Sequence, residues 1–382
     1  MRVTPLVLMV ILLSCTKSSE VLKDTTPTKS ATEPESCHFG QRAFSNTKRT
    51  LLSPERRKPP KGNTPTPAPT GPVILLDFDG HLVSQTSWNV NGDIACSPAN
   101  MTTEEALSIL NRVTEDYSPF NVTVTVDEAV YNAADPYKRM RVIITETWEW
   151  FGKAGGTSYL NSFTWGDNTP CFVFSSLLGY EVKKVGEAAA HEAGHTLGLR
   201  HQALYTDCVY TSEYHSGQGT GEISWAPIMG NSYYRNLSTW SNGPNPYGCT
   251  ALQDDLAILS GMLGYKADDH GNTISSATVL LATTTGIINT NSDIDFFTVN
   301  TSAAITVSIV PFNYSTNEGA NLDIQVKMYN KDGTLLHTIN DPLLLSAALN
   351  FVPGTYYMQV ETVDNLYATR YGMVGRYAIN IN

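Results

Sequence analysis

A short stretch near the middle of the chain combines histidines and a glutamate at spacings that suit metal chemistry. It reads His191-Glu192-Ala193-Gly194-His195-Thr196-Leu197-Gly198-Leu199-Arg200-His201. Residues four apart share one face of an α-helix, so His191 and His195 can direct two imidazoles at one ion, with Glu192 beside them. Ordinary helix and loop histidines are the alternative, but with only 8 histidines among 382 residues they would rarely fall at these spacings.

The third histidine needs a turn after the helix. Gly198 lies three residues after His195, where a helix can end in a left-handed conformation that glycine adopts with little strain. The chain can then deliver His201 as a third ligand, and three imidazoles leave a fourth tetrahedral position for water, as catalytic zinc requires. Zinc lowers the pKa of that water toward roughly 7. Glu192 can take its proton and pass it to a leaving amine, so the sequence predicts a hydrolytic Zn2+ site with Glu192 as catalytic base.

The motif H-E-x-x-H-x-x-G-x-x-H resembles the zinc motif of the metzincin metallopeptidases. Metzincins place a methionine turn beneath the metal, and Ala226-Pro227-Ile228-Met229-Gly230 resembles that turn in sequence and in order. The resemblance implies a zinc metalloendopeptidase acting on proteins or peptides, with Met229 as the apolar floor of the site. It also implies that the strand over residues 169–176 is the sheet edge along which a substrate peptide pairs. A core methionine in a loop and a simple core strand are the alternatives.

Some details differ from the metzincin subfamilies. Tyr233 and Tyr234 come later after the turn than the tyrosine that some metzincins bring to the metal, so packing is their expected role. Gln202 stands where an acidic residue often follows the third histidine. A gluzincin, which would take a distant Glu as third ligand in place of His201, stays open as an alternative.

Hydrophobic patterns indicate which elements position these residues. Strands are expected at residues 73–78, 122–126, 142–144 and 171–174, followed by the histidine helix from Val185 to Leu197. Residues 72–265 are therefore predicted to form an α+β metzincin-like catalytic domain, in which a twisted mixed sheet carries the active-site helix.

Two further helices have recognisable ends. Thr102 and Glu105 form a capping box at the start of a helix that ends before Pro119. A later helix is expected to open at Thr250 with Gln253 as its capping partner, and to end at residue 264.

Residues 266–382 change to short alternating strands separated by Gly, Asn and Asp, a pattern typical of an all-β sandwich. The stretches 268–273, 293–297 and 354–357 resemble the bacterial pre-peptidase C-terminal (PPC) domain. Some relatives bind matrix polymers or calcium, so the resemblance allows a Ca2+ site at Asp268, Asp269 and Asn272. All three are equally suited to turns. A catalytically idle adhesion protein that uses this sandwich is the second functional hypothesis, although the intact Glu192 argues against it.

The first residues indicate export. Residues 1–14 form a short apolar signal segment that ends in a sequence resembling the lipobox of bacterial lipoproteins, with Cys15 as the lipidated residue. A plain signal peptide is the alternative. Residues 15–71 are rich in Pro, Ser and Thr and are expected to be a tether or pro-segment. The expected location is the cell surface, the outer membrane or the extracellular space, with membrane contact only through the lipid.

Export makes disulfides plausible. Cys96, Cys171, Cys208 and Cys249 fall in the predicted catalytic region and allow two bridges, in any of three pairings. Cys37 is the odd cysteine, expected to be a linker thiol or to form an intermolecular disulfide, with a zinc-capping thiolate as the alternative.

Charge excludes one class of partner. The formal net charge of -11 argues against nucleic acid, because phosphate binding needs a basic surface. Asp77, Asp79 and His81 could form a further metal site, but solvated or capping carboxylates are the favoured interpretation.

Overall fold

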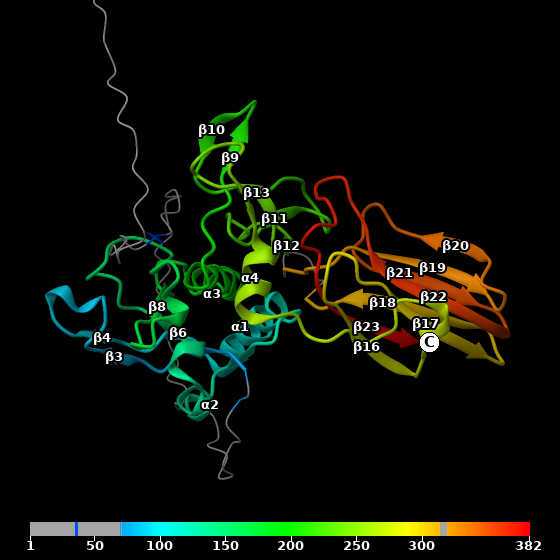
Figure 1. The fold of residues 1–382 in the computed structure, drawn as a ribbon, viewed down its shortest axis with the longest axis horizontal. Coiled ribbons are helices and arrows are strands. Elements are labelled where there is room, and N and C mark those ends of the chain that lie inside the picture. Colours follow the sequence, from blue (N-terminus) through cyan, green and yellow to red (C-terminus); the bar gives the residue numbers. More distant parts are fainter. Residues whose placement is uncertain (1–34, 37–68, 70, 314–318) are drawn as a thin grey trace, which may run out of the picture. The chain divides into compact units, whose positions relative to one another are not determined.

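The computed structural model describes residues 35–36, 69, 71–313 and 319–382 (Figure 1). The predicted signal segment, the lipidation site Cys15 and the odd cysteine Cys37 lie outside these residues. Among the described helices, none has both the length and the apolar character needed to cross a membrane.

A six-stranded mixed sheet forms the base of the first half of the structure, in the order β1-β7-β8-β6-β2-β5. Its members are β1 (Glu35–Ser36), β2 (Val73–Asp77), β5 (Thr123–Thr125), β6 (Arg139–Thr145), β7 (Gly156–Ser158) and β8 (Cys171–Phe174). Strands β5, β2, β6 and β8 run parallel to their neighbours, whereas β7 is antiparallel to β8 and β1 is antiparallel to β7. The predicted mixed sheet is confirmed.

Four α-helices accompany this sheet within the described residues. They are α1 (Thr103–Asp116), α2 (Glu128–Ala133), α3 (Val182–Thr196) and α4 (Asp255–Leu263). The capping box of Thr102 and Glu105 starts α1 as predicted, and α3 begins three residues earlier than predicted. The predicted start of α4 at Thr250 is wrong, because residues 252–254 pair as a strand and Asp254 caps the helix instead.

The sheet has two different faces. Alternate residues of a strand point to opposite faces. On β8, Cys171 and Val173 pack in the core shared with α1 and α3, whereas Phe172 and Phe174 pack in an aromatic cluster on the other side. Helix α3 therefore packs against the face of β8 that carries Cys171 and Val173.

This alternation explains the cysteines. The structure pairs Cys208 with Cys249, while Cys96 and Cys171 are unpaired and buried. The second of the two expected disulfides is thus wrong: Cys96 packs with the aromatic cluster, and Cys171 faces the opposite side of the sheet.

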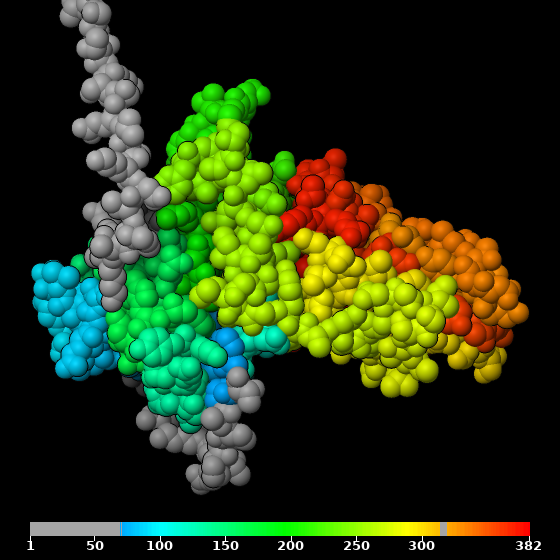
Figure 2. Space-filling model, viewed as in Figure 1, coloured from blue at the N-terminus to red at the C-terminus, as the bar shows by residue number. Residues whose placement is uncertain are grey.

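Short elements fill the connections. The two-stranded pairs are β3 (His81–Val83) with β4 (Ile94–Cys96), β9 (Leu204–Thr206) with β10 (Val209–Ser212), β11 (Trp225–Pro227) with β12 (Leu237–Thr239), and β13 (Asn242–Pro244) with β14 (Leu252–Asp254). Single-turn 3-10 helices lie at Asn89–Asn91, Pro136–Lys138, Ser162–Thr164 and Ile274–Ser276. The β9–β10 hairpin, green at the top of Figure 2, projects from the surface.

The C-terminal part is the predicted β-sandwich. Its five-stranded sheet has the order β15-β17-β22-β19-β20 and its four-stranded sheet the order β16-β23-β18-β21. The strands are β15 (Thr278–Val279), β16 (Thr283–Ile288), β17 (Asp295–Thr301), β18 (Ile305–Pro311), β19 (Ile324–Asn330), β20 (Leu335–Ile339), β21 (Ala347–Phe351), β22 (Gly354–Thr362) and β23 (Gly375–Ile381). Apolar side chains of both sheets form one core, which includes Phe297, Val326, Val307 and Tyr377.

Candidate metal centre

Helix α3 delivers two histidines and the glutamate from its buried C-terminal half. His191, Glu192 and His195 are each at most 3% exposed. The helix ends in a Schellman motif, with Leu199 N–H donating to Gly194 O at 3.0 Å and Gly198 N–H donating to His195 O at 2.9 Å. Gly198 adopts the left-handed conformation that the sequence predicts, with φ of 109°. The chain therefore reverses at once and buries His201 beside the helix.

The three imidazoles form one cluster, called here the three-histidine cluster. Their candidate ligand atoms lie within 4.8 Å of one another, and Nε2 of His195 is 3.0 Å from Nε2 of His201. Each Nδ1 points outward to an acceptor: His191 to Ile228 O at 2.8 Å, His195 to Leu199 O at 2.7 Å, and His201 to a carboxylate oxygen of Glu213 at 2.8 Å.

These contacts determine the tautomers. A carbonyl or a carboxylate can only accept, so each Nδ1 carries a proton, and in the neutral imidazole Nε2 is then left with a lone pair. The lone pairs of His195 and His201 then face each other at 3.0 Å, and His191 Nε2 is buried without a hydrogen-bond partner among the described residues. A cation relieves this arrangement, and Zn–N bonds of about 2.0–2.1 Å in tetrahedral geometry put ligand nitrogens roughly 3.3 Å apart. The cluster fits a zinc ion.

Burial also keeps His191 and His195 neutral. Desolvation, with a smaller contribution from His201, lowers the pKa of His191 to about 3, and desolvation lowers the pKa of His195 well below its usual value. Neutral imidazoles are the form that binds metal ions.

Strand β7 contacts the predicted catalytic base. The Ser158 hydroxyl donates a hydrogen bond to a carboxylate oxygen of Glu192. A Cβ at Gly156 would lie 2.5 Å from the other carboxylate oxygen of Glu192, so only glycine lets the strand pass this close. Neither residue was predicted to be part of the site, because Gly-Thr-Ser carries no apolar alternation that would indicate a strand.

The methionine turn supports the site mainly through its backbone. Ile228 O accepts from His191, and Met229 O accepts from the N–H of Gln202 at 2.7 Å, directly after the third histidine. The Met229 side chain is fully buried, and a Cβ at Gly194 would lie 2.7 Å from its sulfur. Met229 therefore packs tightly against α3 one residue before His195.

The tyrosine beside the cluster is one that the sequence analysis missed. Tyr233 is buried in the core, in keeping with the packing role expected for it, whereas Tyr234 is 59% exposed and is not part of the core. The ring of Tyr214 instead lies against His201, with 4.4 Å between ring centroids. Gln202 donates to the buried Asp255 at 3.0 Å, so an acidic group is present nearby although it does not follow the third histidine in sequence.

The predicted substrate edge is misplaced. Strand β8, which holds most of residues 169–176, lies inside the sheet between β7 and β6. The outer neighbour of β8 is β7, and β1 in turn pairs with β7 through Glu35↔Ser158 and Ser36↔Thr157. The strand beside Glu192 is therefore β7, and it becomes a free edge only when the β1 segment leaves it.

The candidate site at Asp77, Asp79 and His81 is better explained as an ion pair. The Asp77 carboxylate accepts a hydrogen bond from Arg141, which also binds Glu128 at 2.6 Å. A carboxylate neutralised by arginine needs no metal ion.

A second cluster of ligating groups lies in the sandwich and is called here the three-aspartate cluster: Asp268, Asp293 and Asp295. Asp293 and Asp295 are at most 5% exposed, and each has one carboxylate oxygen without a hydrogen-bond partner among the described residues. Desolvation raises the pKa of Asp293 to about 6 and that of Asp295 to about 9. Of the other expected residues, Asn272 donates to Asp268 at 2.7 Å within one turn, and Asp269 accepts from the N–H of Ile287 on β16.

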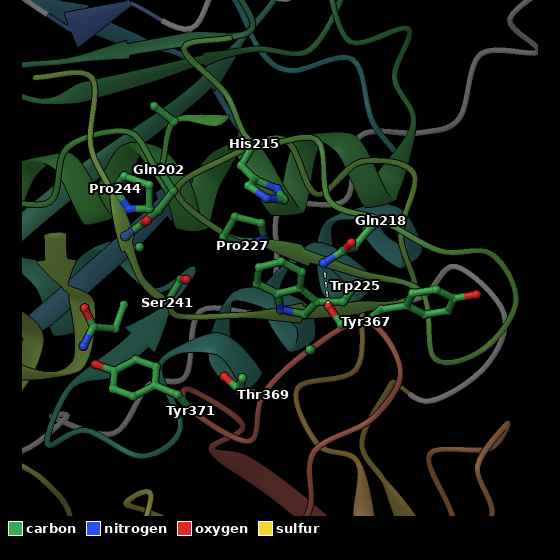
Figure 3. Close-up of a pocket in the computed structure, with 14 residues that line it drawn as sticks. Gln202, His215, Gln218, Trp225, Pro227, Ser241, Pro244, Tyr367, Thr369 and Tyr371 are labelled. Atoms are coloured by element: carbon green, nitrogen blue, oxygen red, sulfur yellow. Dashed lines mark hydrogen bonds between the residues drawn. The ribbon is translucent and has the colours of Figure 1, made fainter. Parts of the chain in front are cut away.

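A pocket of about 250 Å³ includes Pro227 of the methionine turn in its lining (Figure 3). Gln202, His215 and Trp225 line it as well, together with Tyr367, Ala368, Thr369 and Tyr371 from the C-terminal part. The Gln218 side chain donates to Tyr367 O at 3.0 Å across it. None of the three clustered histidines lines this pocket, so it is separate from the metal centre.

No protein-family model and no curated protein matches this chain. Several solved structures are similar to part of it, including the following two. One is the pre-peptidase C-terminal domain of a collagenase from Bacillus anthracis, with a TM-score of 0.20 and 19% identity, covering 28% of this chain and 92% of that chain. Another is PliG of Aeromonas hydrophila, a periplasmic inhibitor of g-type lysozyme, with a TM-score of 0.18 and 13% identity, covering 28% and 96%. With TM-scores of this size, neither similarity carries an argument about the function of this chain.

Proposed function

We propose that this chain is an exported zinc metalloendopeptidase of the metzincin kind. The observation that carries the proposal is the three-histidine cluster, in which buried Nε2 lone pairs converge while every Nδ1 donates outward. His201 lies close enough to His195 to act as third ligand, which supports metzincin over gluzincin chemistry.

The three histidines would hold Zn2+ through Nε2. Bound zinc supplies Lewis-acid polarisation of the peptide carbonyl and activation of the attacking water. The buried surroundings exclude bulk solvent and keep His191 and His195 neutral, so no proton competes for these two ligand positions.

Glu192 would act as general base and then as general acid. It lies next to His191 on the rigid helix α3, and the Ser158 hydroxyl holds one of its carboxylate oxygens in place. From this position Glu192 holds the proton that the attacking water gives up and delivers it to the leaving amine. Ser158 orients the carboxylate and takes no part in the proton transfer.

Strand β7 would bind the substrate backbone. An extended peptide can add to an exposed sheet edge through main-chain hydrogen bonds, and β7 passes directly beside Glu192. Because Glu35–Ser36 already pairs with β7, a substrate must displace this segment. We therefore interpret part of residues 15–71 as a pro-segment that competes for the substrate edge.

The setting would be oxidising and outside the cytoplasm. The Cys208–Cys249 disulfide suits such a compartment. Attachment through a lipid on Cys15 is part of the proposal and concerns a residue outside the described ones. The partners would be protein or peptide substrates, with no nucleic acid.

The PPC-like sandwich would bind Ca2+ at the three-aspartate cluster. Calcium prefers several oxygen ligands, including carboxylates, and the two buried oxygens of Asp293 and Asp295 without protein partners offer such ligands. A bound cation would compensate the charge that burial otherwise disfavours.

Hydrolysis of labelled casein tests the enzyme proposal. We expect Glu192→Gln to lower kcat by about 10²–10⁴-fold, the size typical of losing a general base, while zinc stays bound. Glu181→Gln is the matched control, because Glu181 caps the same helix but is far more exposed. A chelator should stop hydrolysis and added zinc should restore it. Equal rates in the wild type, Glu192→Gln and chelated samples would instead favour the idle adhesion protein.

A further inference from the structure

The three histidines of the cluster differ in what anchors them. His191 and His195 donate their Nδ1 hydrogens to main-chain carbonyls, Ile228 O and Leu199 O. His201 donates to a side chain, the carboxylate of Glu213, at 2.8 Å. Glu213 is therefore the charged acceptor in the set, and it serves the ligand that α3 does not carry.

A carboxylate in this position changes the imidazole more than a carbonyl does. It fixes the Nδ1–H tautomer and the ring orientation, and its negative charge makes the opposite nitrogen a stronger donor to a metal ion. Helix geometry fixes the positions of His191 and His195, whereas His201 follows the turn at Gly198. His201, the ligand that no helix holds in position, thus donates to the strongest acceptor, Glu213.

The hairpin β9–β10 presents Glu213 to His201. The hairpin begins three residues after His201 and ends directly before Glu213, so it closes a loop between the two. The Cys208–Cys249 disulfide ties its turn to the segment before α4, and the Tyr205 hydroxyl donates to Asn245 O at 3.0 Å in the same segment. These contacts hold the hairpin in place, and with it the carboxylate.

We propose that Glu213 is a positioning residue of the metal centre. It acts through His201, holding the imidazole in the tautomer and orientation that bind the metal and strengthening it as a ligand. The inference rests on the proposed zinc site. It adds a residue outside the zinc motif that determines how tightly the metal is held.

Zinc affinity, measured by competition with a chromogenic chelator, tests this without any assay of activity. We expect Glu213→Ala to weaken zinc binding about 10–100-fold, the usual effect of losing such a partner. Glu213→Gln should fall between Glu213→Ala and the wild type, because its amide oxygen still accepts the Nδ1 hydrogen but carries no charge. Glu181→Ala is the matched control: its exposed carboxylate also binds a side chain of α3, Lys184, which is no ligand. Its zinc affinity should stay unchanged.

The visible spectrum of the Co2+-substituted protein supplies a second readout. Glu213→Ala should shift the ligand-field bands, Glu213→Gln should restore part of the wild-type spectrum, and Glu181→Ala should leave it unaltered. Zinc affinity of both Glu213 variants within twofold of the wild type, or an equal loss in the Glu181→Ala control, would overturn the inference. A wild-type protein that binds no zinc would overturn the proposed function, and this inference with it.

Discussion

The three-histidine cluster and the three-aspartate cluster both place ligand atoms within 4.8 Å of one another, yet burial acts on them in opposite directions. Desolvation disfavours the charged form of any group. For His191 and His195 this lowers the pKa and leaves the neutral, metal-binding form. For Asp293 and Asp295 it raises the pKa and favours the protonated form, which binds cations poorly.

The segments that carry the two clusters also differ in how firmly they fix the ligand positions. Two histidines lie on one helix, and the third follows a Schellman turn that fixes its direction. The aspartates come from a connecting segment, a turn and the first residue of β17. The histidine cluster would therefore be prepared before a metal ion arrives, whereas the aspartate cluster would become fully ionised only with a bound cation.

The largest expected effect is on the pH dependence of the aspartate site. Asp295 has a folded-state pKa of about 9, above its unfolded value of 3.8. Without a cation its contribution to stability is therefore fully present below pH 3.8 and is lost as the pH rises through about 9. Calcium should remove this loss. At 100 times its Kd, calcium should raise the Tm at pH 8 by about 5 °C, and by less at pH 5.

Calorimetric melts with a chelator and with calcium, at both pH values, check this expectation. Asp295→Asn should flatten the pH dependence of the Tm and abolish the calcium shift. Asp332→Asn, at an exposed turn of the same sandwich, should change neither. If calcium raised the Tm equally at the two pH values, the claim that burial favours the protonated form of the aspartates would be contradicted.

A smaller effect tests how tightly the histidine site is packed. A Cβ at Gly194 would lie 2.7 Å from the sulfur of Met229, whereas a Cβ at Gly261, also inside a helix, would meet nothing within 4 Å. We expect Gly194→Ala to lower the free energy of unfolding by about 1–3 kcal/mol through overpacking. Gly261→Ala should raise it by about 0.4–1 kcal/mol, because alanine restricts the unfolded chain.

Urea unfolding of the two variants measures the contrast directly. Gly194→Ala should also weaken zinc binding, because a displaced Met229 would move its neighbour Ile228, whose carbonyl accepts from His191. Calcium binding should stay unchanged. A stabilising Gly194→Ala would show that the Met229 side chain moves aside easily, and the histidine site would then be less rigid than we infer.

Local patterns predicted the framework of the site well. The zinc motif indicated α3, the turn at Gly198 and the approach of His201, because each depends on residues within one short segment. The capping box of α1 was readable for the same reason. The methionine turn was recognisable in sequence, but its main-chain contacts to His191 and Gln202 were not.

Long-range placement was harder to predict. Ser158 reaches Glu192 from 34 residues away, on a strand too short and too polar to be recognised. The unpaired Cys96 and Cys171 depend on which sheet face each residue occupies. Gln253, read as a helix cap, donates instead to Arg200 O at 2.7 Å. In each case the partner is set by tertiary packing, which no local pattern contains.

The smallest expected effect concerns the N-terminal segment that pairs with β7. Adjacent residues of a strand direct their N–H groups to opposite sides, so replacing both Glu35 and Ser36 by proline removes the one main-chain donor that faces β7. Each backbone hydrogen bond contributes about 0.5–1.5 kcal/mol, so the segment should compete less well and hydrolysis should rise about 2–10-fold at low substrate concentration. A proline at Ser45, outside the pair, is the control. The aspartate cluster has no part in this pairing, so calcium affinity should be equal in the wild type, the double variant and the control. Unchanged hydrolysis in the double variant would show that β1 does not restrict substrate binding at β7.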